Sequence, residues 1–135
     1  MKKTVKILLF LFCFCFSACT PAPTETPKPP SLVTDVHVSY HYGDMHLKRH
    51  FTDIRKIDII LYYLYGLSPH GTPDEDPEQI WGDCCRITLT MSDGMRHIYR
   101  QQGGRYLSVD NRPWQKISEN QAAVLFPLLM EMQSD

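Results

Sequence analysis

Residues 36–51 read VHVSYHYGDMHLKRHF, and this stretch decides how the fold of the chain is interpreted. Apolar and polar side chains alternate over residues 36–42, which is the period of a half-buried strand. Gly43-Asp44 then offers a two-residue turn, and the alternation resumes at Met45. The stretch therefore predicts an antiparallel hairpin with one apolar face and one polar face.

Counting outward from this turn gives a register that pairs apolar residues with apolar residues. The pairs are Tyr42 with Met45, Tyr40 with Leu47, and Val36 with Phe51. A slip of one residue would turn every one of these side chains to the other face. We therefore expect the register to be fixed.

The same count places four histidines on the polar face as two pairs, His41 with His46 and His37 with His50. Each pair sits where antiparallel side chains approach most closely, so each could chelate zinc, copper or nickel. The pairs lie about 13 Å apart along the strand and cannot share an ion. Two ligands are half of a normal zinc set, and Lys48 lies between the pairs. A solvated strand face that happens to use histidine is the alternative.

The rest of the compact part predicts a helix, a long loop, a meander and a second helix. Residues 54–64 have helical apolar spacing and are followed by Gly66, whereas residues 68–83 show no periodicity. A capping box at Ser118 opens the last helix, which Pro127 should kink or end near Phe126. We expect an α+β fold in a single small domain. An antiparallel sheet of about five strands, hairpin plus meander, carries both helices on one face.

Two turn signals, Asp93-Gly94 and Gly103-Gly104, set the expected register of the meander. Read as two-residue turns, they align Leu89, Ile98 and Val109 on one face and Thr90, His97 and Asp110 on the other. The second row has the composition of a nucleophilic triad, but threonine is a poor nucleophile and no oxyanion donor is evident. We predict that the protein is not an enzyme.

Three aromatic residues are candidates for an interaction surface. Trp81 ends the long loop, where a large aromatic side chain is a common interface anchor. Tyr99 and Tyr106 are expected on the polar face of the sheet beside the histidines. The sequence thus favours a non-catalytic binding module, with a metal-binding or metal-sensing protein as the alternative.

Cys84 and Cys85 allow two arrangements. A vicinal disulfide needs a distorted turn, which the neighbouring Gly82 permits. In a regular strand the two side chains point to opposite faces, which leaves Cys85 buried and Cys84 more exposed.

The N-terminus has the parts of an export signal. Lys2, Lys3 and Lys6 precede an apolar run over residues 7–16, which is shorter than the roughly 20 residues that a membrane-spanning helix needs. The following FSAC, ending at Cys19, resembles the lipobox of bacterial membrane lipoproteins. That resemblance implies lipidation of Cys19, cleavage before it, and a location on the cell membrane facing outside the cytoplasm. The resemblance covers residues 1–19 only, and Phe16 stands where the lipobox usually has an aliphatic residue. No named family is evident in residues 32–135.

The resulting organisation has three parts: a signal peptide over residues 1–18, a lipidated tether over 19–31, and a globular domain over 32–135. Proline and threonine dominate residues 20–31, which is typical of an extended spacer. Removal of the leader takes away three of the 14 basic residues and leaves 11 against 15 acidic ones, a net charge of −4. We therefore expect the membrane and an envelope protein or other extracytoplasmic ligand as partners, and no nucleic acid.

Overall fold

The computed structural model describes residues 31–135, so the predicted signal peptide, Cys19 and most of the tether lie outside the described residues. The strands are β1 (Val33–Tyr42), β2 (Met45–Phe51), β3 (Cys84–Met91), β4 (Arg96–Gln102), β5 (Tyr106–Val109) and β6 (Gln115–Lys116). The helices are α2 (Ile54–Gly66), the 3-10 turn η1 (Pro77–Gln79), α3 (Glu119–Ala122) and α4 (Leu125–Glu131). Within this part of the chain, no helix is long and apolar enough to cross a membrane.

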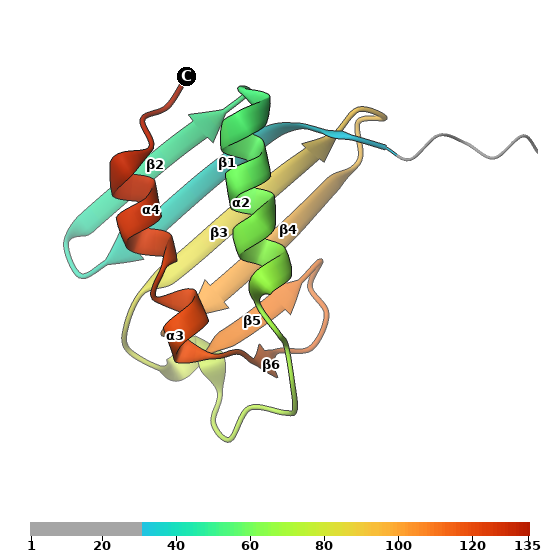
Figure 1. Ribbon diagram of the computed structural model, residues 1–135. Coiled ribbons are helices and arrows are strands. Elements are labelled where there is room, and N and C mark those ends of the chain that lie inside the picture. The colour runs from blue at the N-terminus through green and yellow to red at the C-terminus, as the bar shows by residue number, and fades with distance from the viewer. Residues whose placement is uncertain (1–30) are drawn as a thin grey trace, which may run out of the picture.

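The six strands form one antiparallel sheet in the order β2-β1-β3-β4-β5-β6, and the helices cover one of its faces (Figure 1). This is the predicted α+β fold, with the short β6 added to the five expected strands. Within the described residues, none of α2, α3 and α4 lies on the opposite face, which we call the open face; the loop that contains η1 covers one end of it.

The first hairpin has the predicted register. Val36 pairs with Phe51, Tyr40 with Leu47, and His41 with His46. Gly43 is the first central residue of the turn and has φ +57°, which a side chain would strain and which a two-residue hairpin turn requires. Turn and hydrophobic pattern thus specify the same pairing.

The predicted register of the meander is wrong by one residue at both turns. Leu89 pairs with His97 and Tyr99 pairs with Val109, because each turn holds three residues instead of two. One added residue moves every side chain of the following strand to the other face. The row of Thr90, His97 and Asp110 is therefore not formed.

Instead, His97 lies on the helix-covered side of the sheet, opposite Leu89. Its Nδ1 is 2.8 Å from an Asp110 carboxylate oxygen, and that contact is the first cause that lowers the pKa of Asp110. Thr90 lies on the open face, opposite Arg96. Thr90 and His97, which the sequence placed in one row, thus lie on opposite faces of the sheet.

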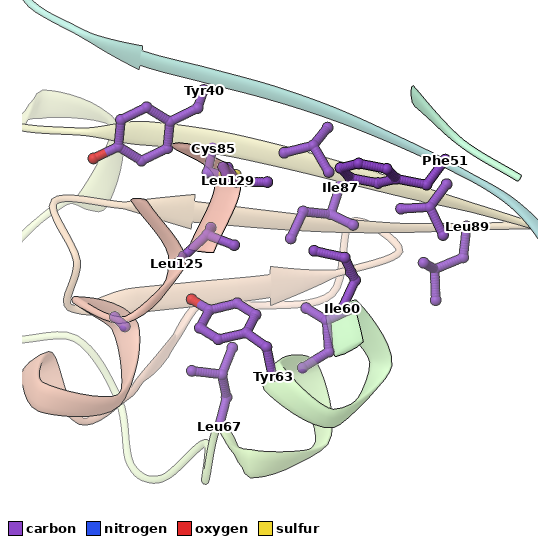
Figure 2. Packing of buried hydrophobic residues seen from close by; sticks show 14 of the residues in the cluster. Tyr40, Phe51, Ile60, Tyr63, Leu67, Cys85, Ile87, Leu89, Leu125 and Leu129 are labelled. Carbon is purple, nitrogen blue, oxygen red and sulfur yellow. The ribbon is translucent and has the colours of Figure 1, made fainter. Parts of the chain in front are cut away.

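The core lies between the sheet and the helices (Figure 2). Its most deeply buried large side chains come from β1, β2, β3, α2 and α4: Val36, Phe51, Ile57, Ile60, Ile87, Leu125 and Leu129. One polar pair is enclosed with them, because the Tyr63 hydroxyl donates to Gln101 Oε1 at 2.9 Å and accepts from Gln101 Nε2 at 2.7 Å. Mutual bonding satisfies two groups that would otherwise be costly to bury.

The C-terminal helix is divided as Pro127 predicts, but the break comes earlier than Phe126. Helix α3 ends at Ala122 and α4 begins at Leu125, which puts Pro127 in the first turn of α4. Proline lacks an N–H, and the first-turn N–H groups of a helix have no acceptor within that helix. With the helix beginning again at Leu125, the missing N–H of Pro127 therefore removes no hydrogen bond within α4. Ser118 is the N-cap of α3, although its side chain makes no capping hydrogen bond.

Candidate functional site

The open face of the sheet carries the two histidine pairs, as the sequence predicts. The rings of His37 and His50 are stacked, with centroids 4.2 Å apart and planes 4° apart. The rings of His41 and His46 meet edge to face at 4.4 Å. Both pairs are therefore close enough for one ion to contact two imidazoles.

Asp35 joins the first pair and turns it into a three-residue cluster. His50 Nε2 lies 2.5 Å from Asp35 Oδ2, and His37 Nε2 lies 3.1 Å from Asp35 Oδ1. One ligand atom from each of the three residues lies within 4.8 Å of the others, and within residues 31–135 no other trio of such donors does so. We call Asp35, His37 and His50 the open-face cluster.

The sequence prediction missed Asp35. It began the strand at Val36, whereas β1 begins at Val33. Side chains two residues apart in a strand share a face, so Asp35 stands on the same face as His37. The aspartate two residues before a predicted strand histidine was the signal that could have identified the third donor.

The cluster offers the kind of donors that late first-row metal ions bind. Two imidazole nitrogens and one carboxylate suit zinc, copper or nickel, and three protein ligands leave a position for water or another ligand. The side chain of Asp35 is 25 % exposed, that of His50 43 % and that of His37 60 %. The cluster is thus open to solvent on the histidine side.

One buried atom of the cluster lacks a hydrogen bond. Asp35 Oδ1 is buried, and its contact with His37 Nε2 does not have hydrogen-bond geometry, so it has no hydrogen-bond partner. A buried carboxylate oxygen without a partner costs free energy. A bound cation would remove this cost.

The second pair is less complete. His41 Nε2 lies 3.1 Å from the Ser39 hydroxyl, and no carboxylate of residues 31–135 joins the pair. Cys84 lies opposite His41 on the neighbouring strand, but its sulfur does not form a trio with the two imidazoles. The structure therefore separates two histidine pairs that the sequence treats alike.

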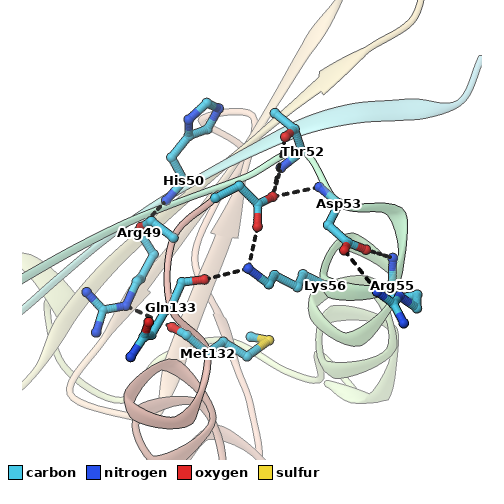
Figure 3. A network of polar contacts seen from close by, with 10 residues as sticks. Arg49, His50, Thr52, Asp53, Arg55, Lys56, Met132 and Gln133 are labelled. Carbon is cyan, nitrogen blue, oxygen red and sulfur yellow. Dashed lines mark hydrogen bonds and ion pairs between the residues drawn. The ribbon is translucent and has the colours of Figure 1, made fainter.

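The last residues of the chain hold His50 in place. The N–H of His50 donates to the Ser134 hydroxyl, and its carbonyl accepts from the N–H of Asp135 at 3.1 Å. Figure 3 shows this network, in which residues 133–135 lie against the junction of β2 and α2. The position of one ligand of the cluster thus depends on a segment 84 residues further along the chain.

Asp135 completes this junction. Its carboxylate accepts from the N–H groups of Thr52 and Asp53, both at 2.6 Å, and pairs with the Lys56 ammonium. The bond from Lys56, followed by the two backbone bonds, lowers the pKa of Asp135 well below its usual range. A carboxyl with a depressed pKa stabilises the fold above its ordinary pKa of about 4, and that contribution is lost as the pH falls further.

We predict that Asp135→Asn lowers the melting temperature at pH 7 and that the difference from wild type narrows below about pH 4. The amide keeps the size of the side chain but loses the charge that pairs with Lys56. Thermal unfolding followed by circular dichroism at pH 7 and pH 3 measures both effects. Asp58→Asn, at an exposed position of α2, is the matched control. Parallel curves for Asp135→Asn and wild type across this pH range would contradict the prediction.

Of the predicted interaction residues, only Trp81 is exposed. Its side chain is 99 % accessible on the loop before β3. Tyr99 lies on the helix-covered face opposite Ile87 and packs against the core, because of the register difference in the meander. Tyr106 is on the open face but only 4 % exposed. The predicted aromatic surface of Tyr99 and Tyr106 is therefore wrong.

The acidic loop over residues 68–83 accounts for the burial of Tyr106. Glu75 accepts from the Tyr106 hydroxyl at 3.2 Å and lies 3.5 Å from Arg105. Asp74 pairs with Lys116 at 2.8 Å, and Glu78 lies 3.5 Å from Arg100. Basic residues of β4, β6 and the turn before β5 thus hold the loop down over one end of the open face.

The cysteines follow the regular-strand arrangement instead of forming a vicinal disulfide. Both thiols are free, with Cys84 exposed and Cys85 buried. They are the first residues of β3, where consecutive side chains point to opposite faces. Burial raises the pKa of the Cys85 thiol, which keeps it protonated and unreactive.

Comparison with known proteins identifies no family for this chain. No protein-family model, no curated protein and no solved structure matches the chain.

Proposed function

We propose that this protein is a membrane-anchored, extracytoplasmic, non-catalytic binding module whose open-face cluster binds one late first-row transition metal ion. The observation that carries the proposal is the convergence of Asp35, His37 and His50 within 4.8 Å. The lipobox-like sequence around Cys19 supports the anchor. The proposal thus combines the two alternatives from the sequence: the binding module is the metal-binding protein, and the metal ion is what it binds.

The arrangement of the donors favours a transition metal over calcium or magnesium. Both imidazoles direct Nε2 toward the same carboxylate, so an ion between them would meet two nitrogens and at least one oxygen. Hard cations prefer sets made of oxygen atoms alone, whereas zinc, copper and nickel accept imidazole readily. Zinc would complete four-coordination with one ligand from outside the protein.

The surroundings also favour an anionic ligand next to the metal. A hollow of about 380 Å³ adjoins His37 and His50 and is lined by Lys48 and Arg86, neither of which has an acidic partner among residues 31–135. These two cations oppose a bare metal ion but attract an anion that fills its open coordination position. The bound species is therefore the metal ion together with a small anion.

Calorimetric titration of the full-length chain in detergent with zinc, copper and nickel tests the proposal. We expect one site with a dissociation constant below about 10 μM for at least one of these ions, and an affinity at least tenfold lower in Asp35→Asn. The amide still accepts hydrogen bonds but is a far weaker ligand. Both proteins contain the same five cysteines, so the difference isolates the cluster from binding by thiols. Equal affinities for wild type and Asp35→Asn would exclude the cluster as the site.

A further inference from the structure

A second hollow lies on the other side of the sheet, at the end where the β1–β2 turn approaches α3 and α4. Its volume is about 600 Å³, within the range of small-molecule sites. Its lining includes the aromatic rings of Tyr40 and Phe126, the carboxylates of Asp83 and Glu119, and the backbone of Gly103-Gly104. Figure 2 shows Tyr40 at the margin of the labelled core, with its hydroxyl directed away from the other side chains.

The wall of the hollow is aromatic. The rings of Tyr40 and Phe126 lie 5.3 Å apart and are tilted by 31°. Tyr42 and Met45, which face each other across the β1–β2 pair, extend this wall toward solvent and are 58 % and 38 % exposed. Aromatic faces carry negative electrostatic potential, so a wall of this kind attracts cations as well as apolar groups.

The charged side chains of the hollow are all acidic. Asp83 accepts a hydrogen bond from the Tyr40 hydroxyl at 3.3 Å, which fixes its carboxylate beside the aromatic wall. No basic side chain lines the hollow, and Asp83 forms no ion pair within residues 31–135. Glu119 is paired with Arg105 at 3.4 Å, and that arginine is outside the lining. Asp83 is thus a carboxylate that has no counterion.

The Tyr40 hydroxyl donates to Asp83 Oδ2, whereas Asp83 Oδ1 is the oxygen nearer to Gly104. Burial, followed by the charge of Asp83, raises the pKa of Tyr40, so the phenol stays neutral and continues to donate to Asp83. Gly104, which has no side chain, also lines the hollow, and a β-carbon at this position would lie 3.6 Å from Asp83 Oδ1. A ligand beside Gly104 would therefore lie next to the Asp83 carboxylate, in the same hollow as the two rings.

We propose that this hollow binds an organic ammonium ion, a small cation with an apolar body. The ammonium group would lie between the Asp83 carboxylate and the faces of Tyr40 and Phe126, a combination of ion pairing and cation–π attraction. The apolar body would cover Tyr42 and Met45. This inference is independent of the metal proposal, because none of these residues belongs to the open-face cluster.

Glycine-selective nitrogen-15 labelling of the full-length chain provides a direct assay, since the seven glycines give seven backbone signals. Choline and putrescine are the probes, and 3,3-dimethylbutan-1-ol is the neutral isostere of choline. We expect both cations to shift the Gly103 and Gly104 signals in a saturable way and to leave Gly66 and Gly94 unchanged. A preference between the two probes identifies a quaternary or a primary ammonium head group.

Two variants separate the charge from the aromatic wall. Asp83→Asn keeps the acceptor for Tyr40 and should weaken cation binding about tenfold or more, whereas the exposed control Asp58→Asn should leave it unchanged. Phe126→Leu keeps the carboxylate and an apolar side chain, and should weaken binding of choline severalfold. The neutral isostere binding as well as choline, or no shift with either cation up to about 50 mM, would overturn the proposal.

Discussion

Phe51→Ala is expected to destabilise the protein by about 3–5 kcal/mol, a large fraction of the roughly 5–15 kcal/mol of stability that native domains usually have. Phe51 is fully buried, is the last residue of β2 and lies opposite Val36 at the end of the first hairpin furthest from its turn. Removing the ring leaves a cavity between the sheet and the helices, which the surrounding side chains fill only in part.

Urea denaturation followed by circular dichroism measures this loss. Tyr62→Ala is the matched control, because it removes an aromatic ring that is 84 % exposed on α2. Its effect should stay within about 0.5 kcal/mol. Comparable losses for the two variants would mean that Phe51 does not occupy the core position described above.

Replacing both histidines of the open-face cluster by alanine is expected to lower zinc affinity by about 100-fold or more. The double variant of His37 and His50 keeps only one of the three donors that lie within 4.8 Å. The equivalent double variant of His41 and His46 removes the same two imidazoles from a pair without a third donor. We expect it to change the affinity less than about threefold.

Zinc-dependent melting temperatures compare the two variants without a calorimeter. A ligand that binds only the folded state raises its stability with concentration, so the shift should vanish in the first variant and persist in the second. Both have the same number of histidines, which controls for adventitious surface binding. If the zinc-dependent rise in melting temperature were lost equally in both double variants, the open-face cluster would not be the single zinc site.

The first hairpin was predictable because several local signals agree on it. The alternation over residues 36–42, the glycine at position 43 and the apolar pairs all require the same register. The pairing of His37 with His50 follows from that register alone. Helix α2 was predictable for a similar reason: Asp53 caps its first turn and Gly66 ends it.

The meander was harder because its turn signals do not specify loop length. Asp93-Gly94 fits a two-residue turn, but the chain uses Gly94, with φ +84°, as the last residue of a three-residue turn. In the first hairpin a wrong register would bury histidines, whereas β4 alternates less clearly. Ile98 and Tyr99 are adjacent, and either could have faced the core.

The candidate site was predictable only in part. The histidine pairs follow from register, but the difference between them depends on where β1 begins and on Asp35. The support of His50 by Ser134 and Asp135 joins residues more than 80 positions apart, and no local pattern indicates such a contact. The burial of Tyr106 under Glu75 also depends on a contact between residues far apart in the sequence.

The contact of residues 134–135 with β2 has a consequence for self-association. β2 is an edge strand, and an edge with free N–H and C=O groups is a template on which another chain can add a strand. The segment occupies both backbone groups of His50, and the charged Lys48 lies nearby on the same strand. The residues that position a ligand of the cluster thereby also leave His50 without free backbone groups to which a strand of another chain could pair.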